Sequence, residues 1–154
     1  MTVLVTWYRQ KLDETWCAAD TRISADSVPI TDRGPKILPI PIVTHREAGG
    51  RWKVHQRHEI GFGFAGSVLS ANNAYSIMSV CTQNLAVNSR SRNIPSIEEL
   101  ALLFRDIAKD VIIDASSRGI GSYSDQYKYF FKSHIFGFCK KNSCFKGYDF
   151  LSNW

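Results

Sequence analysis

The sequence predicts an α+β fold in which an antiparallel sheet is covered by helices. Three observations carry this prediction: β-like runs up to Gly66, helical periodicity through the middle of the chain, and aromatic, β-rich runs after residue 127. Strands that are segregated from helices along a chain are typical of α+β proteins. The length of 154 residues fits one domain, residues 1–154, with a sizeable core.

The chain begins with a predicted β-hairpin. Residues 3–8 alternate apolar and polar side chains, and residues 15–23 form a second β-like run, so the two are expected to pair antiparallel. Residues 24–35 are rich in turn-forming residues and are predicted to be a loop. The extended segment 36–43 contains two prolines, which favour the edge or the end of a strand.

A turn is predicted at residues 45–50, and residues 51–66 then form one long strand or two short ones. The pattern changes after Gly66. Between residues 67 and 87 apolar side chains recur at spacings of three and four, which predicts a well-buried helix. The positions that define this stripe are Val68, Ala71, Tyr75, Met78 and Leu85.

A second helix follows a predicted loop at residues 88–95. Ser96 with Glu99 three residues later matches a capping box, and an apolar face continues to Val111. Gly- and Ser-rich residues 116–124 are predicted to end this helix. The chain then returns to two β-rich runs, residues 127–139 and 144–150, which are expected to form a hairpin.

Composition and charge make several classes of function unexpected for this chain. The net charge is +5, but the basic residues are spread along the sequence, so no nucleic-acid partner is expected. We find no apolar run of membrane-spanning length and no secretory pattern, which favours a cytoplasmic location without a membrane partner. The four cysteines are interpreted as small buried apolar groups. Cys139 and Cys144 lack a second Cys/His pair nearby, so no metal is expected.

Thr2 is the first candidate for chemistry. A hydroxyl is a weak nucleophile unless a base removes its proton, and a free α-amine has a pKa near 8, so an N-terminal Thr carries nucleophile and base together. The structural alternative is that Thr is simply a common second residue that suits a strand. Position alone favours that alternative, so the neighbouring segments decide between the two.

Asp20 and Lys36 are the charged candidates. If the first two strands pair, Asp20 lies beside the N-terminus; the alternatives are a turn residue or a surface ion pair with Arg22. Lys36 enters a strand among apolar neighbours and could lower the pKa of the Thr2 hydroxyl, or it could be an exposed edge-strand lysine. The glycine-rich segment ending at Gly66 lets backbone N–H groups approach a substrate, or simply forms a tight turn.

Four segments together resemble the proteasome β-type subunits of the N-terminal nucleophile hydrolases, including bacterial proteasome-like peptidase subunits. They occur in the family's order and approximate spacing: TVLV at residues 2–5, AADTR at 18–22, GPKI at 34–37, and GFAGS at 63–67, followed by a helix. The resemblance covers most of residues 2–115 and extends to residues 128–150. It implies Thr2 as the nucleophile, Asp20 and Lys36 as the activating pair, and the Gly66 N–H as the oxyanion donor.

The resemblance also implies substrate contacts, a fold and an assembly. Phe64 and Val68 would line the pocket for the side chain before the scissile bond, and Thr21 and Arg22 would hold the substrate backbone. The implied fold is a four-layer αββα sandwich, incomplete at its C-terminus because family members continue further. The implied activity is a cofactor-free threonine peptidase or amidohydrolase in a homo-oligomeric ring that an ATPase partner could feed with peptide or unfolded protein. The alternatives are a non-catalytic or truncated assembly subunit that keeps the fold, and a small α+β binding domain unrelated to the family.

Overall fold

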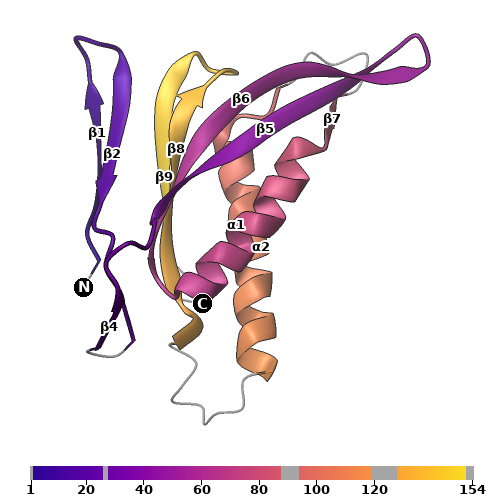
Figure 1. Ribbon diagram of the computed structural model, residues 1–154. Helices are drawn as coiled ribbons and strands as arrows, with labels where there is room; N and C mark the ends of the chain where they lie inside the picture. The colour runs from indigo at the N-terminus through magenta and orange to yellow at the C-terminus, as the bar shows by residue number, and fades with distance from the viewer. Residues whose placement is uncertain (1, 26–27, 88–93, 119–127, 152–154) are drawn as a thin grey trace.

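A five-stranded sheet and two helices form the body of the molecule in the computed structural model, which describes residues 2–25, 28–87, 94–118 and 128–151 (Figure 1). The strand order is β7-β5-β6-β8-β9, and every pairing is antiparallel except β5 with β7. The strands of this sheet are β5 (Ile37–Ala48), β6 (Arg51–Gly66), β7 (Leu85–Val87), β8 (Phe131–Cys139) and β9 (Cys144–Leu151).

Helices α1 (Val68–Gln83) and α2 (Ile97–Arg118) cover one face of this sheet and contact each other (Figure 1). Alternate residues of the strands point at them, because side chains along a strand alternate between its two faces. Phe62 of β6 lies at the centre of the core, fully buried between the sheet and both helices. Its ring lies near Phe104 of α2 and Tyr75 of α1, with centroids 4.8 and 5.9 Å away.

A separate hairpin, β1 (Leu4–Arg9) with β2 (Glu14–Ala19), forms the third layer. It lies on the face of the large sheet opposite the helices, since Leu4 occupies the space where a side chain at Gly63 would stand. The ring of Tyr8 lies 5.4 Å from that of Phe145 on β9. Two short strands, β3 (Ile23–Ala25) and β4 (Val28–Thr31), form a second small hairpin.

The structure confirms the mixed α+β class, the first hairpin, the long strand over residues 51–66, both helices and the last hairpin. Three predictions of local structure were wrong. The predicted loop 24–35 contains β4 and part of β3, and the predicted turn 45–50 is β5 up to Ala48 with a turn only at Gly49 and Gly50. The predicted helix 67–87 ends at Gln83, and its last residues are β7.

Two further predictions lie partly outside the described residues: the loop 88–95 and the helix-ending segment 116–124. Within the described part, α2 continues through Arg118, three residues into that segment. None of the described helices is long and apolar enough to cross a membrane. The cysteines are all free thiols, and Cys139 is buried as predicted, whereas Cys81 is exposed on α1 because it lies away from the helix face that contacts the sheet.

The proline-containing part of β5 contacts α1 along its outer edge. β7 pairs only with Thr44 to Arg46, so among the described strands β6 alone pairs with β5 at Pro39 and Pro41. The Tyr75 hydroxyl donates a hydrogen bond of 2.8 Å to the Pro39 carbonyl, and the Thr82 hydroxyl donates one of 2.7 Å to the Pro41 carbonyl. The two prolines therefore lie where the sequence predicted them, in an edge region of the strand.

The predicted capping box at the start of α2 is present. The Ser96 N–H donates to Glu99 Oε2 at 2.7 Å, the Glu99 N–H donates to Ser96 Oγ at 3.1 Å, and Lys141 Nζ lies 3.0 Å from Glu99 Oε2. The backbone N–H of Ser96, with Lys141 and the Ser96 hydroxyl group, lowers the pKa of Glu99 to about 2. The ionised carboxylate is therefore favoured by the folded state.

Glu99→Gln is expected to lower the free energy of unfolding at pH 7 by about 1 kcal/mol, since the carboxylate is half exposed and its ion pair is screened. A lowered pKa contributes stability that is present above the unfolded value of 4.5 and is lost as the pH falls toward about 2. The difference in the free energy of unfolding between wild type and variant, measured by urea titration, should therefore shrink as the pH falls from 4.5 toward about 2. Glu98→Gln is the matched control. An unchanged difference at low pH would contradict this prediction.

Candidate active site

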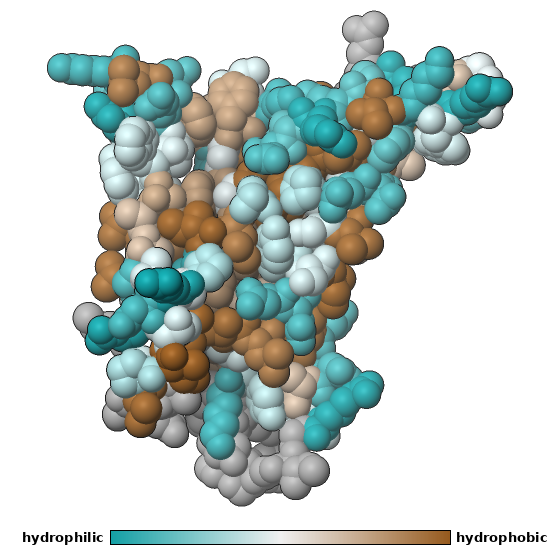
Figure 2. Space-filling view, in the orientation of Figure 1, coloured by the Kyte–Doolittle hydropathy of each residue, from teal (hydrophilic) through white to brown (hydrophobic). Residues whose placement is uncertain are grey.

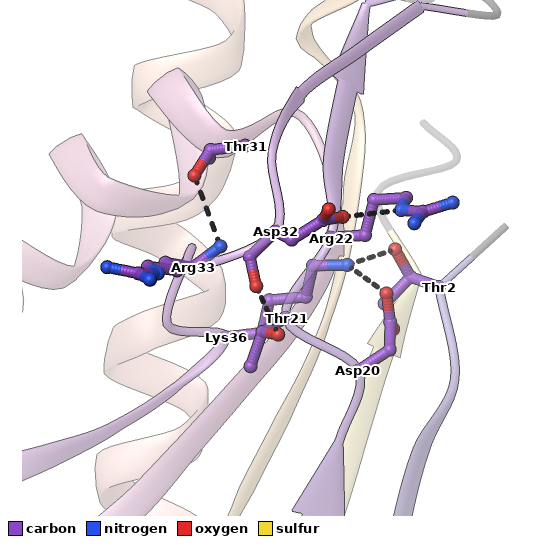
Figure 3. A network of polar contacts seen from close by, with 8 residues as sticks. All are labelled: Thr2, Asp20, Thr21, Arg22, Thr31, Asp32, Arg33 and Lys36. Carbon is purple, nitrogen blue, oxygen red and sulfur yellow. Dashed lines mark hydrogen bonds and ion pairs between the residues drawn. The ribbon is translucent and has the colours of Figure 1, made fainter.

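Lys36 is a buried lysine immediately before β5, with 4% of the residue exposed. Its carbonyl accepts a 3.1 Å hydrogen bond from the Phe64 N–H, which fixes the residue beside β6. Its Nζ donates to Thr2 Oγ1 at 3.0 Å and to Asp20 Oδ2 at 2.7 Å (Figure 3). The alternative interpretation as an exposed edge-strand lysine is therefore wrong.

The hairpin β1–β2 brings Asp20 to the N-terminus. Leu4 pairs with Ala19, and the pattern continues one residue further, with the Asp20 N–H donating to the Val3 carbonyl at 3.1 Å. The Val3 N–H in turn donates to Asp20 Oδ1 at 2.9 Å. The hydrogen bond from Lys36, followed by that from the Val3 N–H, lowers the pKa of Asp20. Asp20 therefore accepts on both carboxylate oxygens and stays ionised.

Thr2, Asp20 and Lys36 thus converge from three segments far apart in the sequence, and Figure 3 shows their polar ends pointing toward one another. A buried ammonium 3.0 Å from a hydroxyl oxygen stabilises negative charge as it develops on that oxygen. Asp20 compensates the cation, since its carboxylate lies 2.7 Å from Nζ. The arrangement can therefore favour ionisation of the Thr2 hydroxyl.

A second polar network, centred on Asp32, lies beside this one (Figure 3). The Arg22 Nε donates to Asp32 Oδ1 at 2.6 Å, and the Thr21 hydroxyl donates to the Asp32 carbonyl at 2.6 Å. The ion pair is exposed on both sides, and the bond to Asp32 raises the pKa of Arg22, with a smaller contribution from Asp20. The predicted alternative, a pair between Asp20 and Arg22, is therefore wrong: Asp20 pairs with Lys36.

Asp32 is the residue that the sequence prediction missed. It orients both predicted substrate-binding residues, Thr21 and Arg22, so that the strand end carrying them is tied to the segment leading to Lys36. The Gly34 N–H strengthens the same link by donating to the Thr21 carbonyl at 2.8 Å. An aspartate in the turn-rich TDRGP stretch, four residues before Lys36, was the available signal.

Gly66 ends β6 and is followed by Ser67, the N-cap of α1. Its φ of +113° favours glycine, and a Cβ there would lie 2.7 Å from the Phe130 carbonyl oxygen, so the position has no room for a side chain. Gly61 and Gly63 are the other two glycines of this segment. They lie within β6, where their missing side chains admit Phe136 and Leu4.

The predicted pocket residues, Phe64 and Val68, pack in or against the hydrophobic core. Phe64 is 2% exposed and its ring is stacked on Phe62 within the core. Val68, in the first turn of α1, is partly buried and packs against the same core. The structure thus brings Thr2, Asp20 and Lys36 into direct contact, holds Thr21 and Arg22 beside them, and gives Phe64 and Val68 a packing role.

Comparisons of the chain with protein-family models, with curated proteins and with solved structures find no match.

Proposed function

We propose that the protein is an N-terminal threonine hydrolase that cleaves peptide or amide bonds. The observation that carries the proposal is the contact of one buried ammonium, Lys36 Nζ, with both the Thr2 hydroxyl oxygen and the Asp20 carboxylate. Burying a lysine costs free energy. A lysine whose only role was to form an ion pair would be less costly at the surface. A role of Thr2 as a nucleophile explains the position of Lys36, because such a hydroxyl needs a nearby cation.

In the proposed reaction, Thr2 Oγ attacks the carbonyl carbon of the substrate, and its proton passes to the α-amine of Thr2. Lys36 stabilises the charge on Oγ, and Asp20 holds Lys36 in place. The tetrahedral intermediate collapses as the C–N bond breaks and the leaving amine takes the proton, which leaves an ester on Thr2. Water, deprotonated by the same α-amine, then releases the acid. We assign the Gly66 N–H to the oxyanion.

The three observed layers also support an αββα sandwich as the finer fold, with the hairpin β1–β2 as part of the second sheet. The outward face of that hairpin supports an oligomeric ring, since it carries exposed apolar side chains, including the stacked pair Trp7 and Trp16. Hydrophobic groups are visible over this hairpin at the left of Figure 2. The same surface favours the second candidate, a non-catalytic assembly subunit.

Mass spectrometry of the intact protein, with and without a peptide vinyl sulfone, tests the proposal. We expect a mature chain that begins at Thr2, because the amine is a base only when Met1 has been removed. We also expect a single adduct, which disappears in Thr2→Ala and persists in Thr2→Ser. A retained Met1, an adduct that survives Thr2→Ala, or no adduct on a chain that begins at Thr2 would contradict the proposal and favour the assembly subunit.

A further inference from the structure

Strands β8 and β9 form the last hairpin of the chain (Figure 1), and its turn brings two cysteines together. Cys139, the last residue of β8, pairs directly with Cys144, the first residue of β9. Four residues separate them, and the Asn142 N–H closes the turn by donating to the Cys139 carbonyl at 3.1 Å. Directly opposite residues of antiparallel strands point to the same face of the sheet, so the two thiols are neighbours.

The spacing of such a pair suits a reversible disulfide bond. Directly opposite residues have Cα atoms about 4.5–5.5 Å apart, inside the range of roughly 4.4–6.8 Å that disulfides span. Their Cβ atoms are about 4.5–5.5 Å apart, slightly more than the ~3.5–4.5 Å of a disulfide. Closing the bond therefore requires the strands to draw together, and a disulfide with imperfect geometry is more easily reduced. Both cysteines are free thiols in this structure.

Contacts with two other elements hold this turn in place. Lys141 reaches α2, with its Nζ 3.0 Å from Glu99 Oε2. Lys140 reaches β6, where its Nζ donates to the Arg57 carbonyl at 3.3 Å. A turn that is already fixed lowers the entropy that the two thiols lose when they join. The fold therefore favours the bond beyond what the short sequence separation alone would give.

The two thiols differ in accessibility. Cys139 is 1% exposed and belongs to the hydrophobic core on the helix side of the sheet, whereas Cys144 is only partly buried. A reagent in solution therefore reaches Cys144 before Cys139, since reactive cysteines are those that are partly exposed. The pair combines an accessible attacking thiol with a shielded neighbour that can resolve the first adduct, a combination typical of redox-sensing cysteines.

We propose that Cys139 and Cys144 form a redox-active dithiol that exchanges with low-molecular-weight disulfides such as oxidised glutathione. The Cys144 thiolate attacks one sulfur of the glutathione disulfide, which forms a mixed disulfide and releases one glutathione thiolate. The Cys139 thiol then loses its proton and attacks Sγ of Cys144, which closes the intramolecular bond and releases the second glutathione. The protein gives up two electrons and two protons, and the glutathione disulfide gains them as two thiols.

The other two cysteines of the chain offer no competing partner. Cys17 lies on β2, where its Sγ accepts a 3.4 Å hydrogen bond from the Thr6 hydroxyl, and β2 lies on the face of the large sheet opposite the helices. Cys81 is exposed on α1, away from the helix face that contacts the sheet. The reaction uses neither Thr2 nor Lys36, so the proposal does not depend on the hydrolase proposal.

Intact mass and peptide mapping of the full-length protein, incubated in mixtures of reduced and oxidised glutathione, test the proposal. We expect the loss of two hydrogens and a disulfide that maps to Cys139 and Cys144, reversed by excess reduced glutathione. Cys139→Ala should stop at a stable glutathione adduct on Cys144, because the resolving thiol is gone. Cys144→Ala should leave Cys139 without an adduct, because that thiol is buried. Circular dichroism verifies that each variant is folded.

The matched control is the double variant Cys17→Ala, Cys81→Ala, which removes the other two thiols and should change the equilibrium constant for the bond by less than about twofold. The same titration in concentrated urea gives the constant for the unfolded chain, which we expect to be at least about tenfold lower. Equal constants in the two conditions would assign the bond to sequence separation alone and overturn the proposal. So would a disulfide that involves Cys17 or Cys81, or no bond in the folded protein.

Discussion

Replacing Lys36 by methionine should slow the acylation of Thr2 by about 10²–10³-fold, the usual effect of removing one group that stabilises developing charge. The substitution keeps most of the side-chain volume at a position that is 4% exposed, so the fold should survive. It removes the ammonium that lies 3.0 Å from Thr2 Oγ1. The rate of adduct formation with the peptide vinyl sulfone, followed by intact mass, measures the effect.

Lys11→Met serves as the control, since Lys11 is exposed in the turn between β1 and β2. A urea titration of each variant separates a catalytic loss from unfolding. If Lys36→Met were folded and still acylated within threefold of the wild-type rate, Lys36 would have no part in activating Thr2. The buried contact with Asp20 would then be structural only.

Replacing Phe62 by alanine should lower the free energy of unfolding by about 3–5 kcal/mol, because a fully buried phenylalanine is lost and a cavity remains. Phe62 contacts both helices, since its ring lies near those of Tyr75 and Phe104. The variant should therefore loosen both helices together. Chemical denaturation followed by circular dichroism gives the loss.

Phe138→Ala is the matched control, because Phe138 is 39% exposed and its main aromatic partner is Phe145. We expect a loss of about 1 kcal/mol there. Similar losses in the two variants, or a loss below about 1.5 kcal/mol for Phe62→Ala, would mean that the core does not depend on the contact between β6 and the helices.

Much of the fold follows from local pattern. The first and last hairpins and α1 and α2 carry strong periodicity or a capping box, so alternation and helical spacing identify them. β7 was missed because Leu85 continues the helical spacing, while its three residues become a strand only through pairing with β5. The strand β4 was missed for the opposite reason: its VPIT residues lie among turn formers, and only the pairing with β3 makes them extended.

The candidate site was predictable where hairpin geometry determines it. Pairing of the first two strands brings Asp20 to Thr2, and Lys36 was identified as an unusual lysine among the apolar residues that enter a strand. The outer part of the candidate site was not predictable, because by charge alone the partner of Arg22 could be either Asp20 or Asp32. Only the approach of the segment before β5 selects Asp32. The depth of Phe64 was equally hidden, because alternation identifies a buried face without saying what lies against it.

The contact of α1 with the proline part of β5 limits how two molecules could aggregate. Prolines offer no N–H, and the Pro39 and Pro41 carbonyls already accept bonds from Tyr75 and Thr82. A foreign strand approaching this rim would find no N–H donor at these two residues and carbonyls that already accept a hydrogen bond, which disfavours β-augmentation there. The sheet thus carries built-in protection against amyloid-like growth along that side, supplied by two imino acids and two hydroxyl groups.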